Sequence, residues 1–301
     1  MENTQLPKFF IDMLEKQYGC DYKDIINGFI CKRKTTFRVN TLKSSNKEIE
    51  DELKKNNIEY EKVDFSDIAY ITNANENKLQ ELEIYKDGKI YLQSLSSMLP
   101  PIILNPMPEK DVLDMTAAPG GKTTQMAAIS NNKAHITACE MNSIRAERLK
   151  YNVEKQGANC VYCMVKDSRT IDDFFSFDQI LLDAPCSGSG TLNANDENIG
   201  KFFTEKLIEK SVKAQTNLLN KAIKILKTGC EMVYSTCSIL ACENEDVIDK
   251  VLKKGNVEIV PIEDEIIEKL PILKTKIKGT LLVKPNELFE GFFVAKLKRI
   301  K

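Results

Sequence analysis

The sequence predicts a doubly wound α/β domain with a mostly parallel sheet, preceded by a small α+β domain. From residue 111 onward, strand-like and helix-like segments alternate, as they do when helices connect parallel strands. The segment 178–184 is almost continuously apolar, which is typical of a parallel strand that is buried on both faces. Residues 1–105 instead mix short helical and short strand patterns, which favours an α+β domain.

The regular part of the chain is expected to contain five strands that helices connect, and two late strands. The five strands are expected at 111–115, 134–140, 161–165, 178–184 and 230–237. The helices are expected from Gly120-Gly121 to about residue 130, and at 143–156, 204–226 and 242–253. The late strands are expected at 257–261 and 291–297. Such an alternation implies a parallel sheet with helices on both faces.

The first part of the chain has a different pattern. Amphipathic helices are expected at 6–16 and 47–57, and short strands at 36–40, 58–63 and 68–71. Prolines then interrupt the chain at 100, 101, 106 and 108. We therefore predict two domains, an N-terminal domain at 1–105 and a ligand-binding α/β domain at 106–301.

The composition is that of an ordinary globular protein. The chain has 301 residues, of which 42% are hydrophobic and 29% are charged, so a disordered tail and a collagen-like repeat are excluded. No apolar run approaches the ~18 residues that span a bilayer. The first residues lack a basic segment followed by an apolar stretch, so no secretory signal is expected. The nine cysteines are too sparse for a disulfide scaffold and are expected to be reduced thiols in the cytoplasm.

Charge is concentrated in two zones, although the formal net charge of the chain is only −1. Residues 25–47 contain six basic residues and no acid, and residues 270–301 contain eight basic residues and two acids. Local basic zones bind phosphates in many proteins that have little net charge. A solvated lysine-rich surface is the alternative interpretation.

The segment from Asp114 to Thr123 joins the first strand of the regular part to its helix. Its small residues allow a ligand to approach the backbone closely. It is not a phosphate-binding P-loop, because that pattern needs glycine where Thr116 stands, and the G-x-G-x-x-G fingerprint is also absent. A tight turn without a ligand remains an alternative.

Two acids follow the next two strands. Glu140, 26 residues after Asp114, ends the second strand and can accept hydrogen bonds from both ribose hydroxyls of a nucleoside. Asp167 follows the third strand and can accept a hydrogen bond from an adenine amino group. The alternatives are an acid at a helix N-terminus for Glu140 and a helix N-cap for Asp167.

Two cysteines follow the fourth and fifth strands, in the segments 183–190 and 235–238. Ligands of doubly wound sheets bind at the carboxyl ends of the strands, so Cys186 and Cys237 are expected at the reactive edge. A thiol becomes a nucleophile when a nearby cation or helix N-terminus lowers its pKa. The alternative is inert packing. A metal site is not expected, because Cys160 and Cys163 form a single C-x-x-C pair and His135 is the only histidine.

Taken together, these motifs resemble those of the RsmB/RsmF-type RNA cytosine-5 methyltransferases, also called the Sun family. The resemblance rests on AAPGGK at 117–122, DAPCSG at 183–188 and STCS at 235–238, which follow successive strands in this order. It extends to R-x-N-x-L at 38–42, Q-x-x-S from residue 93, Glu-Asn-Glu at 243–245 and Gly-Phe-Phe at 291–293. It therefore covers nearly the whole chain.

The resemblance implies a class I methyltransferase fold with a seven-stranded sheet, and S-adenosylmethionine as the cofactor. By position, Glu140 holds the ribose hydroxyls, Arg145 supports the cofactor loop, Asp167 meets the adenine, and Asp183 lies between the cofactor and the target base. The methionine and ribose part of the cofactor is implied to lie against Ala117, Ala118, Pro119, Gly120, Gly121 and Lys122.

The implied reaction explains why two cysteines are needed. Carbon 5 of cytosine is a poor nucleophile until a thiolate adds to carbon 6, and a base must later remove the proton from carbon 5. The sequence alone does not decide which cysteine attacks. The resemblance assigns the attack to Cys237 and release to Cys186, with Asp183 stabilising the adduct and Lys122 assisting.

The implied partner is RNA, either ribosomal or transfer RNA, with no metal, membrane or obligate protein partner. The N-terminal domain is expected to contact RNA through its basic residues Lys32, Arg33, Lys34 and Arg38. Two alternatives remain at this point. One is a catalytically silent RNA-binding or assembly factor with the same fold, and the other is a methyltransferase that acts on a small molecule or a protein.

Overall fold

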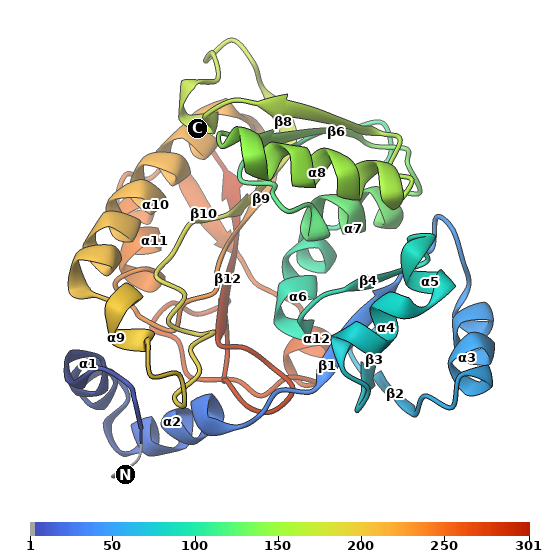
Figure 1. Cartoon of the computed structure of the whole chain (residues 1–301). Helices are drawn as coiled ribbons and strands as arrows, with labels where there is room; N and C mark the ends of the chain where they lie inside the picture. Colours follow the sequence, from blue (N-terminus) through green and yellow to red (C-terminus); the bar gives the residue numbers. More distant parts are fainter. Residues whose placement is uncertain (1–3) are drawn as a thin grey trace.

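The computed structural model describes residues 4–301, so residues 1–3 of the predicted N-terminal domain lie outside the described part. The chain forms one large sheet and one small sheet, with helices around both (Figure 1). Within the described residues, no helix is long and apolar enough to cross a membrane.

The large sheet has eight strands. Their bounds are β5 Asp111–Asp114, β6 His135–Glu140, β7 Val161–Val165, β8 Phe177–Asp183, β9 Leu226–Thr236, β10 Val257–Val260, β11 Leu281–Val283 and β12 Phe292–Arg299. Seven of them follow the order β10-β12-β9-β8-β5-β6-β7, and β11 pairs with β12. The five strands from β9 to β7 are parallel to one another, and β12 pairs antiparallel with β9, β10 and β11. The predicted mostly parallel, doubly wound sheet is confirmed, with β11 as an additional strand.

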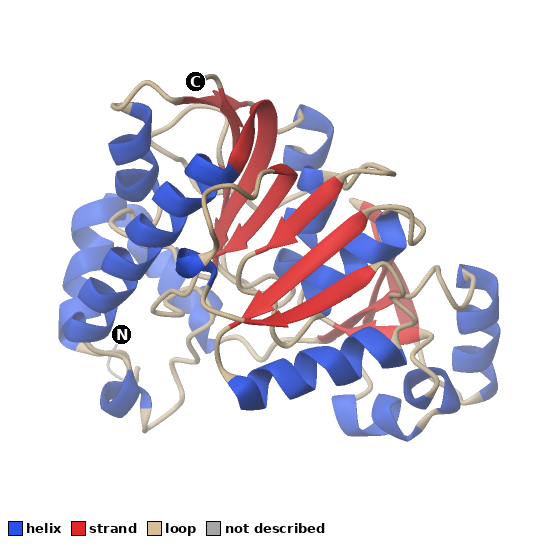
Figure 2. Cartoon of the chain, turned by 90° about the horizontal axis from the view of Figure 1, so that it is seen from above, coloured by secondary structure: helices blue, strands red, loops and turns tan. Residues whose placement is uncertain are grey.

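Helices cover both faces of this sheet (Figure 2). The helices from residue 95 onward are α6 Leu95–Leu104, α7 Gly121–Ile129, α8 Ser143–Lys155, α9 Ile199–Phe202, α10 Glu205–Ile225, α11 Glu245–Leu252, α12 Asp264–Ile267 and the 3₁₀ helix η2 Ser168–Thr170. Alternate side chains of each strand enter different cores: Ile180 and Leu182 of β8 pack into one hydrophobic cluster, and Leu181 packs into another. This alternation explains why the strand is apolar along nearly its whole length.

The small sheet has four antiparallel strands in the order β2-β3-β1-β4. The strands are β1 Thr35–Val39, β2 Tyr60–Val63, β3 Ser66–Thr72 and β4 Ile90–Leu92, and the helices are α3 Asn46–Lys55, α4 Glu76–Glu81 and α5 Glu83–Lys86. Its core is a separate cluster in which the rings of Phe37 and Tyr70 stack at 5.4 Å between centroids. The expected α+β unit is therefore present.

The first helices of the chain pack on the large sheet instead. These are α1 Lys8–Tyr18, the 3₁₀ helix η1 Gly19–Asp21 and α2 Tyr22–Ile30. Phe10 of α1 lies 4.9 Å from the ring of Phe203, and both belong to the core that contains β8 and α10. Helix α6 also packs against α7, β8, β9 and β12. The predicted division at residue 105 places all these helices with the small sheet, and it remains a proposal about domains.

The sequence predicts that Pro100 and Pro101 interrupt the chain. In the structure both prolines instead lie inside α6. Each proline removes a backbone donor and disfavours a helix interior. In α6, however, both prolines are buried among apolar side chains, and Ser94 caps the helix by accepting a hydrogen bond from the N–H of Ser97. Burial of an almost wholly apolar helix outweighs the local preference of the prolines.

A buried arginine joins the small sheet to the large one. Arg38 of β1 is fully buried, and its guanidinium donates to Gln93 Oε1 at 2.9 Å and to Thr124 Oγ1 at 2.8 Å in α7. It also donates to the carbonyl of Gly121 at 3.2 Å. The prediction that Arg38 binds RNA is therefore wrong, because its side chain is enclosed by protein and reaches no surface. It instead fixes the start of α7 relative to the N-terminal sheet.

Candidate active site

A cavity of about 310 Å³ lies where β5, β8 and β9 end. The switch point of the sheet is here, because the chain continues from β5 to β6 on one side and returns through β8 on the other. Of the residues predicted for the site, the cavity wall contains Ala117, Ala118, Pro119, Gly121, Lys122, Asp183 and Cys237. The three separate strand-end motifs thus meet in one cavity, as the sequence predicts.

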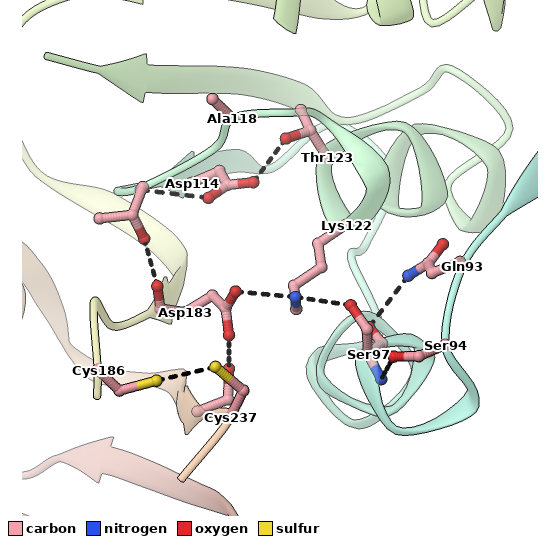
Figure 3. A network of polar contacts seen from close by, with 12 residues as sticks. Gln93, Ser94, Ser97, Asp114, Ala118, Lys122, Thr123, Asp183, Cys186 and Cys237 are labelled. Carbon is pink, nitrogen blue, oxygen red and sulfur yellow. Dashed lines mark hydrogen bonds and ion pairs between the residues drawn. The ribbon is translucent and has the colours of Figure 1, made fainter. Parts of the chain in front are cut away.

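An ion pair forms part of the wall of this cavity, and Figure 3 shows its contacts. Lys122 Nζ is 2.8 Å from Asp183 Oδ2 and donates to Ser97 Oγ at 2.7 Å. Burial disfavours the charged ammonium, but the neighbouring Asp183 carboxylate outweighs this effect and raises the pKa of Lys122. Ser235 donates to the other oxygen of Asp183 at 2.8 Å. The carboxylate is therefore held in one orientation at the cavity wall.

A second carboxyl group lies close by. Asp114, the last residue of β5, is only 1% exposed and accepts hydrogen bonds from Thr123 Oγ1 at 2.6 Å and from the N–H of Thr116 at 3.4 Å. Burial raises the pKa of Asp114 to about 6, the Thr123 hydrogen bond opposes this rise, and the charge of Asp183 adds to it. Asp114 therefore ionises at a higher pH than an exposed aspartate.

The two thiols predicted for the reaction face each other. The sulfur atoms of Cys186 and Cys237 are 2.9 Å apart, and of the two only Cys237 belongs to the cavity wall (Figure 3). The hydrogen bond to Cys237, burial, and the charges of Cys237 and Glu243 raise the pKa of the Cys186 thiol. The geometry therefore places Cys237 at the wall of the cavity and Cys186 behind it.

Glu140, the last residue of β6, is connected through Arg145 to the loop 117–122 at the cavity wall. Its side chain is buried, and its carboxylate accepts from the N–H of Asn142 at 2.8 Å and pairs with Arg145 Nη1 at 3.2 Å. Arg145 Nη2 also donates to the carbonyl of Ala118 at 2.9 Å. Arg145 thus connects the acid at the end of β6 to the loop that follows β5.

Asp167 is at the end of the neighbouring strand, β7, where it caps η2. It accepts hydrogen bonds from the N–H of Arg169 at 3.0 Å and from the Arg169 guanidinium. These hydrogen bonds lower the pKa of Asp167. Glu140, Arg145, Asp167 and Gly120 do not line the cavity itself, so their contact with a cofactor remains a prediction.

The predicted RNA-binding residues Lys32, Arg33 and Lys34 lie between α2 and β1. Lys32 is exposed, whereas Arg33 is half-buried and donates to the carbonyls of Thr191 at 3.4 Å and Gly190 at 3.5 Å. Thr191 lines the cavity. This basic segment therefore lies directly beside the loop that follows Cys186, and its contact with RNA remains a prediction.

Several cavity residues have no role assigned from the sequence. Among them are Tyr91, Ser97, Thr191, Glu290 and Phe292. Ser97 directly follows the Q-x-x-S motif and Phe292 lies in Gly-Phe-Phe at 291–293, so motif position could have indicated them. The ring of Phe292 lies 5.5 Å from Lys122 Nζ. Tyr91 comes from β4 of the small sheet, and no local pattern connects it with this site.

Within residues 4–301, no group of three or more His, Cys, Asp or Glu side chains is placed to hold a metal ion.

Comparison with known families and proteins agrees with this geometry. Residues 101–298 match the family described as 16S rRNA methyltransferase RsmB/F. The chain belongs to this family. Residues 6–74 match the ferredoxin-like domain that is described for RsmF/B-like methyltransferases. The predicted family and the predicted methyltransferase fold are confirmed.

Individual relatives differ in length. The tRNA (cytosine(49)-C(5))-methyltransferase of Pyrococcus abyssi is 33% identical over 280 residues, which cover 88% of each chain. Ribosomal RNA small subunit methyltransferase F of Shewanella loihica is 35% identical over 283 residues, 88% of this chain but only 56% of that protein. The chain thus spans little more than half of this longer relative. The crystal structure of a methyltransferase homolog protein from Pyrococcus horikoshii has a TM-score of 0.83 and 30% identity, and the match covers 98% of this chain and 96% of that one.

The raised pKa of Asp114 predicts a pH-dependent effect of Asp114→Asn on stability. The folded-state pKa of about 6 exceeds the ordinary value of 3.8, so the wild type loses stability as pH rises between these values. Asparagine cannot ionise. We expect the free energy of unfolding of the variant, relative to wild type, to rise by up to about 3 kcal/mol between about pH 4 and about pH 7.

Urea denaturation of the protein without added ligand measures this difference. Asp64→Asn, which changes an exposed aspartate, is the matched control. A relative stability of Asp114→Asn that stays constant with pH would contradict the assignment of a raised pKa to Asp114.

Proposed function

We propose that this chain transfers a methyl group from S-adenosylmethionine to carbon 5 of a cytosine in RNA, through a covalent bond between Cys237 and the base. The observation that carries the proposal is that Cys237 shares one cavity with the Lys122–Asp183 ion pair and the loop 117–122. The names of the relatives in Pyrococcus abyssi and Shewanella loihica support RNA as the substrate and cytosine as the target.

The residues around the loop 117–122 fit the cofactor. The Glu140 carboxylate has about four acceptor positions, and the protein fills two of them, with Asn142 and Arg145. Hydroxyl donors of a ribose can use the others. The loop offers small side chains and backbone to the methionine part. Asp167 can accept from the adenine only if Arg169, which donates to both of its carboxylate oxygens, gives up part of that contact. When bound, S-adenosylmethionine supplies an electrophilic methyl group on a sulfonium.

The first step belongs to Cys237. Its thiolate sulfur forms a bond to carbon 6 of cytosine, and the electron pair of the C5–C6 double bond makes carbon 5 nucleophilic. Asp183, which Lys122 and Ser235 hold in place, accepts a hydrogen bond from the amino group of the base and stabilises the adduct. Carbon 5 then accepts the methyl group.

Release requires two proton movements. The proton on carbon 5 must leave as the C5–C6 double bond forms again and the bond between Cys237 sulfur and carbon 6 breaks. Cys186, whose sulfur is 2.9 Å from that of Cys237, can give its proton to the departing sulfur. The resulting Cys186 thiolate can take the proton from carbon 5. The two thiols thus end the cycle protonated, and one proton is released when Cys237 ionises again.

RNA must reach the cavity with its target base exposed or flipped from its stack. We infer that the segment with Lys32, Arg33 and Lys34 contacts the RNA backbone, because Arg33 touches the same loop that lines the cavity at Thr191. Arg38 takes no part in this contact, since its guanidinium is enclosed within the protein.

Replacing each thiol tests the reaction. Because Cys237 forms the bond to the base, we expect Cys237→Ala to lower the rate of 5-methylcytosine formation by about 10⁴-fold or more. Because Cys186 promotes release, we expect Cys186→Ala to slow turnover and to accumulate a protein–RNA adduct that survives denaturing gels. Unmodified total RNA and labelled S-adenosylmethionine provide the assay.

Cys20→Ala is the matched control, since Cys20 is an exposed cysteine in η1. An adduct in Cys237→Ala and none in Cys186→Ala would reverse the two roles. A wild-type protein that methylates no RNA would contradict the proposed activity and favour a silent RNA-binding factor.

The RNA contact is tested by the double variant Lys32→Ala/Lys34→Ala. If both ammonium groups contact phosphates, we expect weaker binding to all RNA sequences and a log–log salt slope that is smaller by about 1 to 2. Lys54→Ala/Lys55→Ala, which removes two lysines at the end of α3, is the control with the same charge change. Equal losses in both double variants would show that only net charge matters and would overturn the assigned contact.

A further inference from the structure

One buried carboxylate connects the two loops that carry the reactive thiols. Glu243 is 0% exposed and lies shortly before α11. It accepts hydrogen bonds from the N–H and hydroxyl of Ser187, at 2.8 and 2.6 Å, and from the hydroxyl of Ser238 at 2.6 Å. Ser187 follows Cys186, and Ser238 follows Cys237. A single side chain thus holds the residue next to each thiol.

The directions of these hydrogen bonds follow from the chemistry of the groups. An ionised carboxylate only accepts, so both serine hydroxyls must donate their single proton to Glu243. Ser238 Oγ is then an acceptor for its other contacts, which are Ser189 Oγ at 2.7 Å and the N–H of Leu240 at 3.1 Å. The charge of Glu243 therefore orients a chain of hydroxyls that spans both loops.

Neighbouring groups strengthen this connection. Gln215 of α10 donates to Glu243 at 3.2 Å and to the carbonyl of Pro185, just before Cys186, at 3.1 Å. Asn244 accepts from Thr236 Oγ1 at 2.5 Å and donates to the carbonyl of Ser238 at 2.8 Å, on either side of Cys237. Both cysteines are thus fixed at the residues before and after them.

The charge of the Glu243 carboxylate also affects the two thiols differently. The thiol of Cys186 contacts the sulfur of Cys237 and lies near the charged carboxylate of Glu243. The buried phenol of Tyr234 is also near enough to Cys186 for an electrostatic interaction between the two side chains. Of these effects the contact with Cys237 and burial are the largest, and the charge of Glu243 further raises the pKa of Cys186. Cys237, by contrast, lines the cavity together with Lys122.

We propose that Glu243 is a positioning residue for the reaction, which holds both cysteine loops and so fixes the separation of the two thiols, and which places its negative charge beside Cys186. A buried charge is costly for a protein, and its removal leaves donors without an acceptor. Here the charge is matched by four donors that all belong to, or hold, the cysteine loops. The expected effect of Glu243 on kcat rests on the proposed function. The expected effect of Glu243 on the Cys186 thiol does not.

Two substitutions at Glu243 distinguish its role in positioning the cysteine loops from the effect of its negative charge. Glu243→Ala removes the acceptor, so the hydroxyls lose their common partner and the sulfur atoms lose their fixed separation. In Glu243→Gln the amide oxygen can still accept from the Ser187 N–H, and the amide nitrogen can donate to hydroxyls that rotate. That variant keeps the connection and removes the charge. Glu245→Ala and Glu245→Gln are the matched controls, since Glu245 is also buried but bonds to Lys276 instead of a cysteine loop.

We expect Glu243→Ala to lower kcat for RNA methylation by about 100-fold, because misplacement by about 1 Å has such an effect. The KM for RNA is expected to change by less than about threefold, since the Glu243 side chain is fully buried and itself contacts no RNA. Glu243→Gln is expected to recover most of this kcat. If Glu243→Ala does not fold, Ser187→Ala and Ser238→Ala replace it, because each frees one loop.

The second measurement needs no RNA and no methyl donor. Iodoacetamide labelling of Cys186, followed by peptide mass spectrometry over a range of pH, reports how easily this thiol ionises. In Glu243→Gln we expect half-maximal labelling of Cys186 at a lower pH than in wild type, and no such shift in Glu245→Gln.

Two results would overturn the proposal. One is a kcat of Glu243→Ala within about threefold of wild type, or a loss no larger than in Glu245→Ala. The other is an unchanged pH dependence of Cys186 labelling in Glu243→Gln. If wild type methylates no RNA, the proposed function fails, whereas the labelling measurement still decides whether Glu243 controls Cys186.

Discussion

The active site depends on the ion pair between Lys122, at the start of α7, and Asp183, at the end of β8. Removing either partner would leave the other as an uncompensated charge in a largely buried place, which costs several kcal/mol. The pair therefore holds the first turn of α7 against the carboxyl end of β8. Ser97 of α6 binds the same ammonium, and Ser235 at the end of β9 binds the same carboxylate. Four elements thus converge on one charge pair, and Cys237 lies beside it on the cavity wall.

The part of this arrangement that could be predicted from the sequence is the part that sheet topology dictates. The segment 161–165 is predicted and observed with the same bounds, because β7 is a short strand with clear limits. Asp114, Asp183 and Cys237 are far apart in the chain, but each ends or directly follows a parallel strand, and parallel strands end at one edge. Alternation of strands and helices was therefore enough to bring the three motifs together.

The remaining features depend on tertiary contacts that no local pattern describes. Arg38 lies in a basic stretch, which favours a surface position, but the fold uses it to join β1 to α7. Pro100 and Pro101 are strong local signals for a break, yet burial keeps them in α6. Tyr91 reaches the cavity only because the small sheet packs on the large one. The contact of Glu243 with both cysteine loops likewise depends on tertiary packing, because no local pattern around residue 243 indicates hydrogen bonds to Ser187 and Ser238.

The central proposal is that Cys237, and not Cys186, bonds to carbon 6 of the target cytosine. The most direct measurement uses RNA in which 5-fluorocytosine replaces cytosine, because carbon 5 then carries fluorine instead of the proton that release requires. The trapped complex is digested with protease and nuclease, and the modified peptide is identified by mass spectrometry. We predict that the nucleotide is attached to the peptide containing Cys237. Attachment to Cys186, or efficient methylation of normal RNA with no trapped complex, would contradict the proposal.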